Sequence, residues 1–223
     1  MKDLIIRQVP IGSFEVFTYI VACPESRLAA IIDPAGDPEK IVSLVSEENL
    51  RAAFILNTHG HADHILANNR LKEMLGAPIC MHSADENFFS DTDTREKTAK
   101  ELGIICETTV DLLLEDGQIL DMGNQRIQVI HTPGHTPGSV CFLINGNLFT
   151  GDTLFVGAAG RTDLMGGSLD TLIASIRDKL LPLPGDTVIW PGHDYGETPT
   201  STIAREMEEN IYITDFILDA DEN

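Results

Sequence analysis

The densest group of chemically versatile side chains lies in the run Thr58-His59-Gly60-His61-Ala62-Asp63-His64. It places three of the seven histidines and one carboxylate within six positions. Neutral imidazole and carboxylate are ligands that suit zinc, iron or manganese. A single histidine is more often a hydrogen-bonded structural residue than a ligand, but that interpretation does not account for three in so short a stretch. The run therefore indicates a metal site.

The spacing of these side chains bears on the number of metals. In an extended segment His59, His61 and Asp63 would alternate onto one side, and His64 would fall on the other. A chain that turns here would aim two pairs of ligands at two neighbouring points. That is the arrangement a two-metal site needs.

The flanking residues place the run at the end of a strand. Residues 53–56 are a short apolar stretch that predicts a buried strand, and residues 65–75 have apolar side chains at helical spacing up to Gly76. The run thus lies on a loop between the carboxyl end of a strand and a helix. In open α/β sheets this is where ligands bind.

Three later loops repeat the same order of a strand, then glycine, then histidine or aspartate. They are Thr132–Ser139 with His135, Thr150–Thr153 with Asp152, and Trp190–Tyr195 with His193. Proline and glycine beside His135 fix and free the backbone that aims its ring. Each loop alone is weak evidence, but four such strand ends predict an enzyme site on a rigid scaffold.

Strand-like and helix-like segments alternate along the rest of the chain. We predict strands at 13–22, 28–32, 77–81 and 187–190, hairpins at 118–130 and 140–150, and helices at 38–45, 92–102, 168–181 and 202–211. The Asn145-Gly146 pair favours a type I′ turn. Hairpins mixed with helix-separated strands predict an α/β fold with a mixed sheet.

The composition is that of an ordinary globular protein, predicted as one domain over residues 1–223 with a short C-terminal helix and a loose acidic tail (about 201–223). A formal charge of −20 disfavours nucleic acid and anionic membranes as partners. No signal peptide, transmembrane-length apolar run or CxxC pair is present. We expect a cytoplasmic protein with reduced cysteines that acts on a small molecule, and a homo-oligomer is left open.

The four motifs together, His-x-His-x-Asp-His, Gly-His-Thr, Gly-Asp-Thr and Pro-Gly-His, resemble those of the metallo-β-lactamase superfamily. The resemblance extends from Val21 past His193 and is nearest to the glyoxalase II-like branch, which includes persulfide dioxygenases. It implies a four-layer αββα sandwich with two mixed β-sheets. It also implies that one metal is held by His59, His61 and His135, a second by Asp63, His64 and His193, and that Asp152 bridges both.

The resemblance implies a metal-dependent hydrolase of a thioester, with two zinc ions and a metal-bound hydroxide. Asp63 and Asp152 are the carboxylates expected to take part in catalysis. The alternative is a dioxygenase that oxidises glutathione persulfide with one iron on His59, His135 and Asp152; the alternative metal is therefore iron, one or two per chain. A third, non-enzyme hypothesis is a metal-bound sensor module.

Several further residues have two interpretations each. Tyr195 matches a tyrosine that contacts glutathione in the glyoxalase II-like branch, or is a packed aromatic residue. Arg161 pairs with a substrate carboxylate or, as we slightly favour, with Asp163. Asp33 supports a ligand histidine or forms a turn. His82 and His131 lie outside the family's ligand positions and are expected to be structural.

Glyoxalase II enzymes proper resemble this chain only through the metal-binding domain. They continue into a longer helical region that supplies much of the glutathione pocket. Here 30 residues follow His193. The sequence therefore leaves open whether glutathione is recognised.

Overall fold

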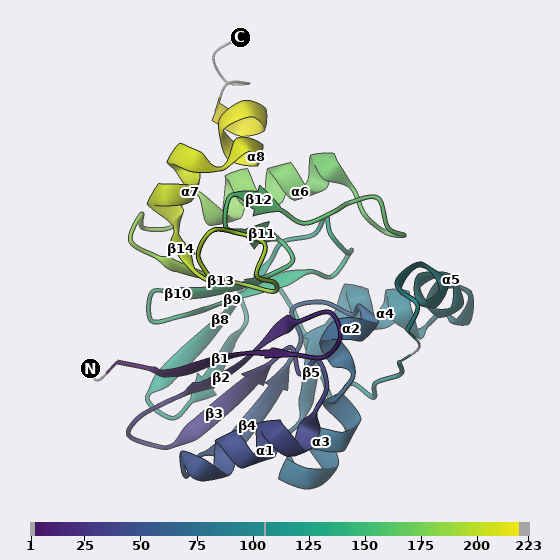
Figure 1. The fold of residues 1–223 in the computed structure, drawn as a ribbon, viewed down its shortest axis with the longest axis vertical. Coiled ribbons are helices and arrows are strands. Elements are labelled where there is room, and N and C mark those ends of the chain that lie inside the picture. Colours follow the sequence, from purple (N-terminus) through teal and green to yellow (C-terminus); the bar gives the residue numbers. More distant parts are fainter. Residues whose placement is uncertain (1–2, 105, 219–223) are drawn as a thin grey trace.

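The computed structural model describes residues 3–104 and 106–218 and contains two six-stranded sheets (Figure 1). The first sheet has the order β1-β2-β3-β4-β5-β6, antiparallel from β1 to β3 and parallel from β3 to β6. Its strands are β1 (Ile5–Ile11), β2 (Val16–Ala22), β3 (Leu28–Ile32), β4 (Arg51–Leu56), β5 (Ile79–His82) and β6 (Leu112–Leu114).

The second sheet has the order β14-β13-β10-β9-β8-β7 and is antiparallel except where β10 pairs with β13. Its strands are β7 (Ile119–Met122), β8 (Gln125–His131), β9 (Val140–Ile144), β10 (Asn147–Gly151), β13 (Val188–Pro191) and β14 (Ser201–Thr202). A small hairpin, β11 (Leu154–Phe155) and β12 (Ala158–Ala159), follows β10. Both large sheets are thus mixed, as predicted.

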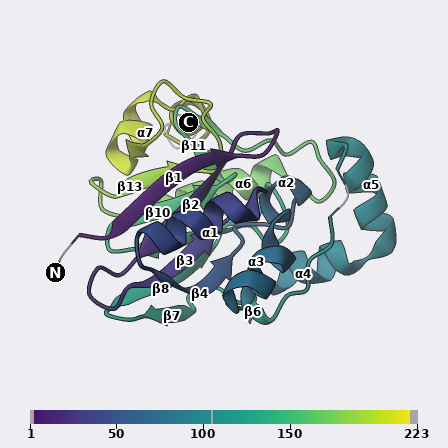
Figure 2. The ribbon, with the colours of Figure 1, turned by 60° about the horizontal axis from the view of Figure 1, so that its bottom comes forward.

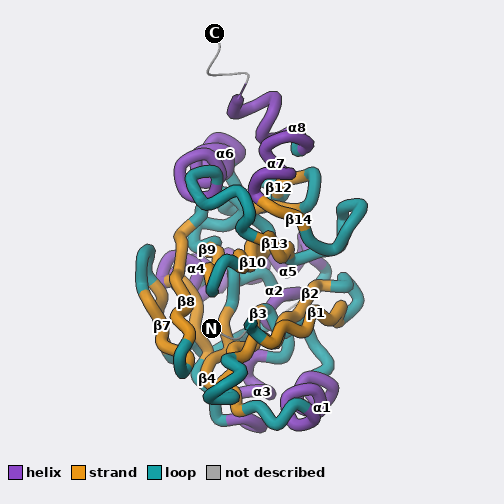
Figure 3. Tube along the Cα trace, turned by 90° about the vertical axis from the view of Figure 1, so that its left-hand side faces the viewer, coloured by secondary structure: helices purple, strands orange, loops and turns teal. Residues whose placement is uncertain are grey.

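Helices cover the outer faces of the two sheets, so the fold is the expected four-layer αββα sandwich (Figure 3). The first sheet is covered by α1 (Pro38–Glu47) and α3 (Asn68–Leu75). The second is covered by α6 (Leu169–Ser175), the π-helical turn η1 (Ile176–Leu180), α7 (Ile203–Glu209), α8 (Ile211–Ile213) and η2 (Thr214–Leu218). In the described ranges every helix is too short or too polar to span a bilayer.

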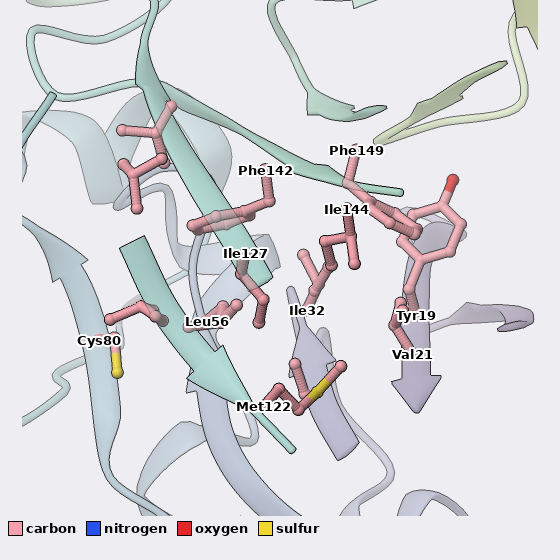
Figure 4. Packing of buried hydrophobic residues seen from close by; sticks show 14 of the residues in the cluster. Tyr19, Val21, Ile32, Leu56, Cys80, Met122, Ile127, Phe142, Ile144 and Phe149 are labelled. Atoms are coloured by element: carbon pink, nitrogen blue, oxygen red, sulfur yellow. The ribbon is translucent and has the colours of Figure 1, made fainter. Parts of the chain in front are cut away.

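The main hydrophobic core lies between the two sheets (Figure 4). Phe142 and Phe149 of the second sheet are fully buried there and face Tyr19, Ile32 and Leu56 of the first. Burial of one such side chain contributes about 1.5–3 kcal/mol. β2 is buried at every position because core lies on both of its faces. This packing sets the position of one sheet relative to the other.

Most predicted elements are present, and the exceptions have physical reasons. The helix predicted at 65–75 is interrupted, since α2 (Ala62–Ile65) ends before α3 begins at Asn68. The N–H of Ala67, between the two helices, donates to the carbonyl of Pro34 at 2.9 Å instead of continuing one helix. Helix α4 (Ser83–Ser90) and strand β6 were not predicted, since α4 is polar and β6 has three residues. α5 (Thr92–Leu102) has the predicted bounds.

The prediction of a loose tail after residue 211 is wrong for residues 212–218. These residues are helical in α8 and η2 and bury Ile213 and Ile217 against the second sheet's outer core. These two apolar residues lie at helical spacing and cover the apolar face of that core, which explains why the segment is helical. Residues 219–223 of the predicted tail lie outside the described residues.

Candidate metal centre

The four strand ends that carry the candidate ligands meet in one buried cluster. The histidines and Asp63 are at most 7 % exposed, and the side chain of Asp152 is 11 % exposed. The backbone joins the two sheets beside the cluster, because Val140 N–H donates to the carbonyl of Thr58 at 2.8 Å. Phe17 N–H donates to the carbonyl of Gly192 at the same distance. The structure thus brings together all seven predicted ligands: His59, His61, Asp63, His64, His135, Asp152 and His193.

Six of these side chains sort into two groups. His59, His61 and His135 form one, and Asp63, His64 and His193 form the other, with the candidate ligand atoms within 4.8 Å of one another in each. The run is not extended throughout, because residues Ala62–Ile65 form the helical turn α2. His64 stays beside His59, with 4.1 Å between their ring centroids, and these two histidines form a third possible group with Asp33. The two groups have the membership that the family resemblance implied.

Asp152 lies between the two groups. Its Oδ2 is 3.6 Å from Nε2 of His135 and 3.5 Å from Nε2 of His193, and its Oδ1 is 3.5 Å from Nε2 of His64. The backbone makes room for this carboxylate at Gly192, where a Cβ atom would lie 2.2 Å from Asp152 Oδ1. A side chain at residue 192 would therefore displace the carboxylate that faces both groups.

Three of the histidines are oriented through Nδ1. His64 Nδ1 is 3.0 Å from Asp33 Oδ2, and His135 Nδ1 is 2.8 Å from the carbonyl of Arg161. His193 Nδ1 is 3.2 Å from the carbonyl of Phe14. A hydrogen bond at Nδ1 fixes the tautomer and leaves Nε2 free to bind a metal. Neither backbone carbonyl could be anticipated, because both come from loops distant in sequence.

Asp33 supports the ligand loop, as the first of its two interpretations held. It accepts hydrogen bonds from Thr58 N–H at 2.7 Å and Thr58 Oγ1–H at 2.5 Å, in addition to its contact with His64. Its backbone is left-handed, with φ of 48°. A non-glycine residue in this region carries strain that surrounding structure must hold in place, as is frequent at functional sites.

Asp85 is a functional candidate that the sequence analysis missed. It is fully buried in α4 and accepts from Gly60 N–H at 2.8 Å, Thr136 Oγ1–H at 2.7 Å and Gly138 N–H at 2.6 Å. Burial raises the pKa of this carboxyl, although the three donors act in the opposite direction. Asp85 therefore joins the loop of His61 to the loop of His135. No motif marks it, because its partners are mostly backbone groups.

The donor atoms of the cluster fit divalent cations. Five buried side-chain atoms lack a hydrogen-bond partner among the described residues: His59 Nε2, His61 Nε2, His64 Nε2, Asp63 Oδ1 and Asp152 Oδ1. Such atoms are costly to bury unless something binds them. Imidazole nitrogens and carboxylate oxygens are the ligand types that zinc and iron accept.

The pKa values of the histidines in the cluster also favour binding of cations. Burial, and then the neighbouring imidazoles, hold the pKa values of His59 and His61 well below the usual range, so both are neutral as ligands must be. Burial also acts to lower the pKa of His64, but the carboxylates of Asp152, Asp63 and Asp33 outweigh it and raise the value to about 10. The second group therefore favours a positive charge.

The predicted substrate-binding residues lie at the rim of the cluster. Tyr195 is 67 % exposed, and its ring stacks on His193 with 5.0 Å between centroids and 3° between planes. Arg161 pairs with Asp163, with Nε–Oδ1 and Nη2–Oδ2 distances of 2.8 and 2.7 Å, as slightly favoured. Both are accessible to a bound molecule. His82 and His131 lie elsewhere and stack on each other, with centroids 4.0 Å apart.

Comparison with known proteins matches residues 12–193 to the model of the metallo-beta-lactamase superfamily. The hydroxyacylglutathione hydrolase GloC of Haemophilus influenzae is 34 % identical over 213 residues, covering 92 % of this chain and 96 % of that protein. The mitochondrial persulfide dioxygenase ETHE1 of Homo sapiens is also 34 % identical, over 201 residues that cover 89 % of this chain and 71 % of that protein.

Solved structures with the same fold include proteins of different named activity. The B3 metallo-beta-lactamase BLEG-1 has a TM-score of 0.85 and 34 % identity, with 94 % of this chain and 100 % of that chain covered. TTHA1623, solved in a di-iron-bound form, has a TM-score of 0.78 and 34 % identity, with 92 % and 98 % covered. The family and the fold are thus shared by relatives whose names indicate different reactions.

Proposed function

The chain belongs to the metallo-β-lactamase superfamily of metal-dependent enzymes, and we propose that it hydrolyses a thioester at a dinuclear centre formed by the two ligand groups. The observation that carries this is the position of Asp152, whose carboxylate faces histidines of both groups at 3.5–3.6 Å. A pair of divalent cations bound there would supply an activated water and polarise a carbonyl oxygen.

The orientation of His64 supports two metals rather than one. Asp33 adopts a strained backbone and contributes a carboxylate oxygen to hold His64 Nδ1, which directs Nε2 into the second group. A one-iron scheme on His59, His135 and Asp152 would use the contact of Asp33 with Thr58 beside His59, but it gives no role to the orientation of His64. Buried groups held by specific hydrogen bonds are typical of ligands whose geometry matters.

One buried ligand and two rim residues have further roles in this scheme. Asp63 belongs to the second group, and its Oδ1 atom has no hydrogen-bond partner in the described part of the chain, so it is placed to orient the nucleophile. Tyr195 and Arg161 are exposed beside His193 and His135 and are placed to hold the thiol half of the substrate. We propose glutathione as that thiol, since GloC, a hydroxyacylglutathione hydrolase, is matched over 96 % of its length.

Metal analysis combined with turnover tests the proposal. We expect protein purified without added metal to hold about two metal ions per chain, zinc in the first instance, and to cleave lactoylglutathione with release of free thiol. Chelator treatment should abolish cleavage, and added zinc should restore it. About one iron per chain, with no thiol released from any thioester, would contradict the proposal.

The second candidate function is oxidation of glutathione persulfide by a single iron. The similarity to ETHE1, equal in identity to that of GloC, is the observation that favours it. His64→Ala separates the two, because His64 is not among the one-iron ligands His59, His135 and Asp152. A dinuclear hydrolase should lose most of its turnover and one metal equivalent. Persulfide-dependent oxygen uptake that survives in this variant would favour the dioxygenase.

A further inference from the structure

A cavity of about 710 Å³ lies beside the metal centre, between α2, α4, α5 and residues 103–104 and 106–110. Its volume is in the range of about 300–1,000 Å³ that small-molecule sites occupy. Gly60, Ile65, Met81 and Thr98 form its buried wall, and Ala62 and Ala99 add small apolar surface. The charged side chains that line it are partly or fully exposed, and one pair, Arg95 with Glu107 at 3.2 Å, joins α5 to the facing loop. The interior is therefore apolar with a polar rim.

The cavity has room because the buried side chains of α5 are small. Helix α1 fills its own interface with Ile41 and Val45, whereas α5 buries Thr94 and Thr98. The hydroxyl of Thr98 donates its proton to the carbonyl of Thr94 at 2.9 Å, so it is not free to donate to a ligand. Figure 2 shows α5 standing at the outer edge of the molecule, away from both sheets. A helix so placed leaves space that a ligand of apolar character can fill.

One aromatic ring lies between this cavity and the metal centre. Phe89 lines the cavity and also packs its ring edge-on against His61, with centroids 5.6 Å apart. The approach depends on Gly60, where a Cβ atom would lie 2.3 Å from Cδ2 of Phe89. Because Gly60 and Ala62 flank His61 and line the cavity, the hollow starts next to a residue of the first ligand group.

From this geometry we infer that the cavity is an acyl pocket, which takes an apolar acyl chain while the carbonyl carbon sits at the metal centre. The inference rests on the proposed thioester hydrolysis and specifies its substrate class: thioesters of medium-length aliphatic acids. In the reaction, water adds its oxygen to the acyl carbon and the carbon–sulfur bond breaks. The thiol leaves with the proton, and the carboxylic acid remains in the pocket. The rim beside His193 and Tyr195 is left for the thiol half.

The test uses the metal-loaded full-length protein and acetyl, hexanoyl and decanoyl thioesters of glutathione. Wild-type kcat/KM should rise by up to about fourfold per methylene until the pocket is filled, as expected for burial of each CH₂. Ala99→Phe places a ring in the cavity and should lower the decanoyl-to-acetyl ratio of kcat/KM at least tenfold. Lys97→Phe adds the same ring to the same helix at an exposed position outside the cavity and should keep the wild-type ratio.

A binding measurement gives a readout independent of turnover. S-decylglutathione, which cannot be hydrolysed, should bind the wild type more tightly than S-methylglutathione does, and Ala99→Phe should remove that difference. Thioester cleavage that is indifferent to acyl length in both wild type and Ala99→Phe would overturn the acyl pocket and leave the proposed hydrolase intact. No cleavage of any thioester by the metal-loaded wild type would overturn both.

Discussion

The two sheets contribute to the metal centre in different ways. The first supplies four ligands from one loop, His59 to His64, after β4. The second supplies three ligands from three separate loops, after β8, β10 and β13. The first set is arranged by a local turn of helix, whereas the second set depends on the register of strands and on how the sheets pack. The four clustered ligands can be recognised from a short stretch of sequence. The three dispersed ligands can be assigned to one site only when the fold brings them together.

The largest effect is expected at the residue that links both sets. Asp152→Ala removes the carboxylate that lies 3.5–3.6 Å from histidines of both ligand groups. We expect kcat/KM to fall by about 10³-fold or more, equivalent to about 4 kcal/mol of barrier. Metal content measured on the same samples should fall as well. Unchanged turnover in this variant would contradict the whole site assignment.

The packing between the sheets should matter for metal binding, and packing outside them should not. Phe142→Ala empties a fully buried position between the sheets and is expected to lower the free energy of unfolding by about 3–5 kcal/mol. Ile41→Ala, under α1 on the outer face, is the control, with an expected loss of about 2–5 kcal/mol. Chelator competition should show weaker metal binding for Phe142→Ala alone. Equal metal affinity in the two variants would mean that sheet packing does not set the site.

The orienting carboxylates should have intermediate effects. Asp33→Asn offers an amide to His64 Nδ1, and Asp85→Asn disturbs the donors from Gly60 and Gly138. Loss of such a partner typically costs about 10–100-fold in metal affinity. We expect Asp33→Asn to weaken one metal equivalent and Asp85→Asn to weaken the other, in a stepwise chelator titration. Wild-type affinity for both equivalents in both variants would show that these contacts are not needed.

The smallest expected effect is the number of protons released when metal binds. The pKa of His64 is raised to about 10, so metal-free protein at pH 8 carries this proton and should release about one per chain when metal binds Nε2. Calorimetry in buffers of different ionisation enthalpy measures the release. Because the folded pKa lies above the unfolded value of about 6.5, the stabilising contribution is complete below pH 6.5 and is lost as pH rises through 10. His64→Gln should remove this slope, and an unaltered slope would assign it elsewhere.

Much of the fold and site followed from local pattern. The strand at 28–32, the helix at 92–102 and the Asn145-Gly146 hairpin have the expected form, and the φ values of 47° and 75° at that turn fit a type I′ geometry. Asp85 could not be found this way, because its helix is polar and its partners come from two other loops. The break in the helix before α3 could not be predicted from the sequence either, since it depends on a hydrogen bond to the carbonyl of Pro34.

The sequence by itself determined which side chains could bind metal, since imidazole and carboxylate chemistry and the strand-glycine-histidine order are local properties. The tertiary structure alone decided how near Asp152 lies to the histidines of both groups and which of two roles Asp33 has. It also revealed Asp85 and the cavity that α5 leaves beside His61. The physical reason is that these features depend on the packing of segments far apart in the chain. The local sequence determines which ligand atoms a residue can provide, and the packing of the two sheets determines which groups those atoms contact.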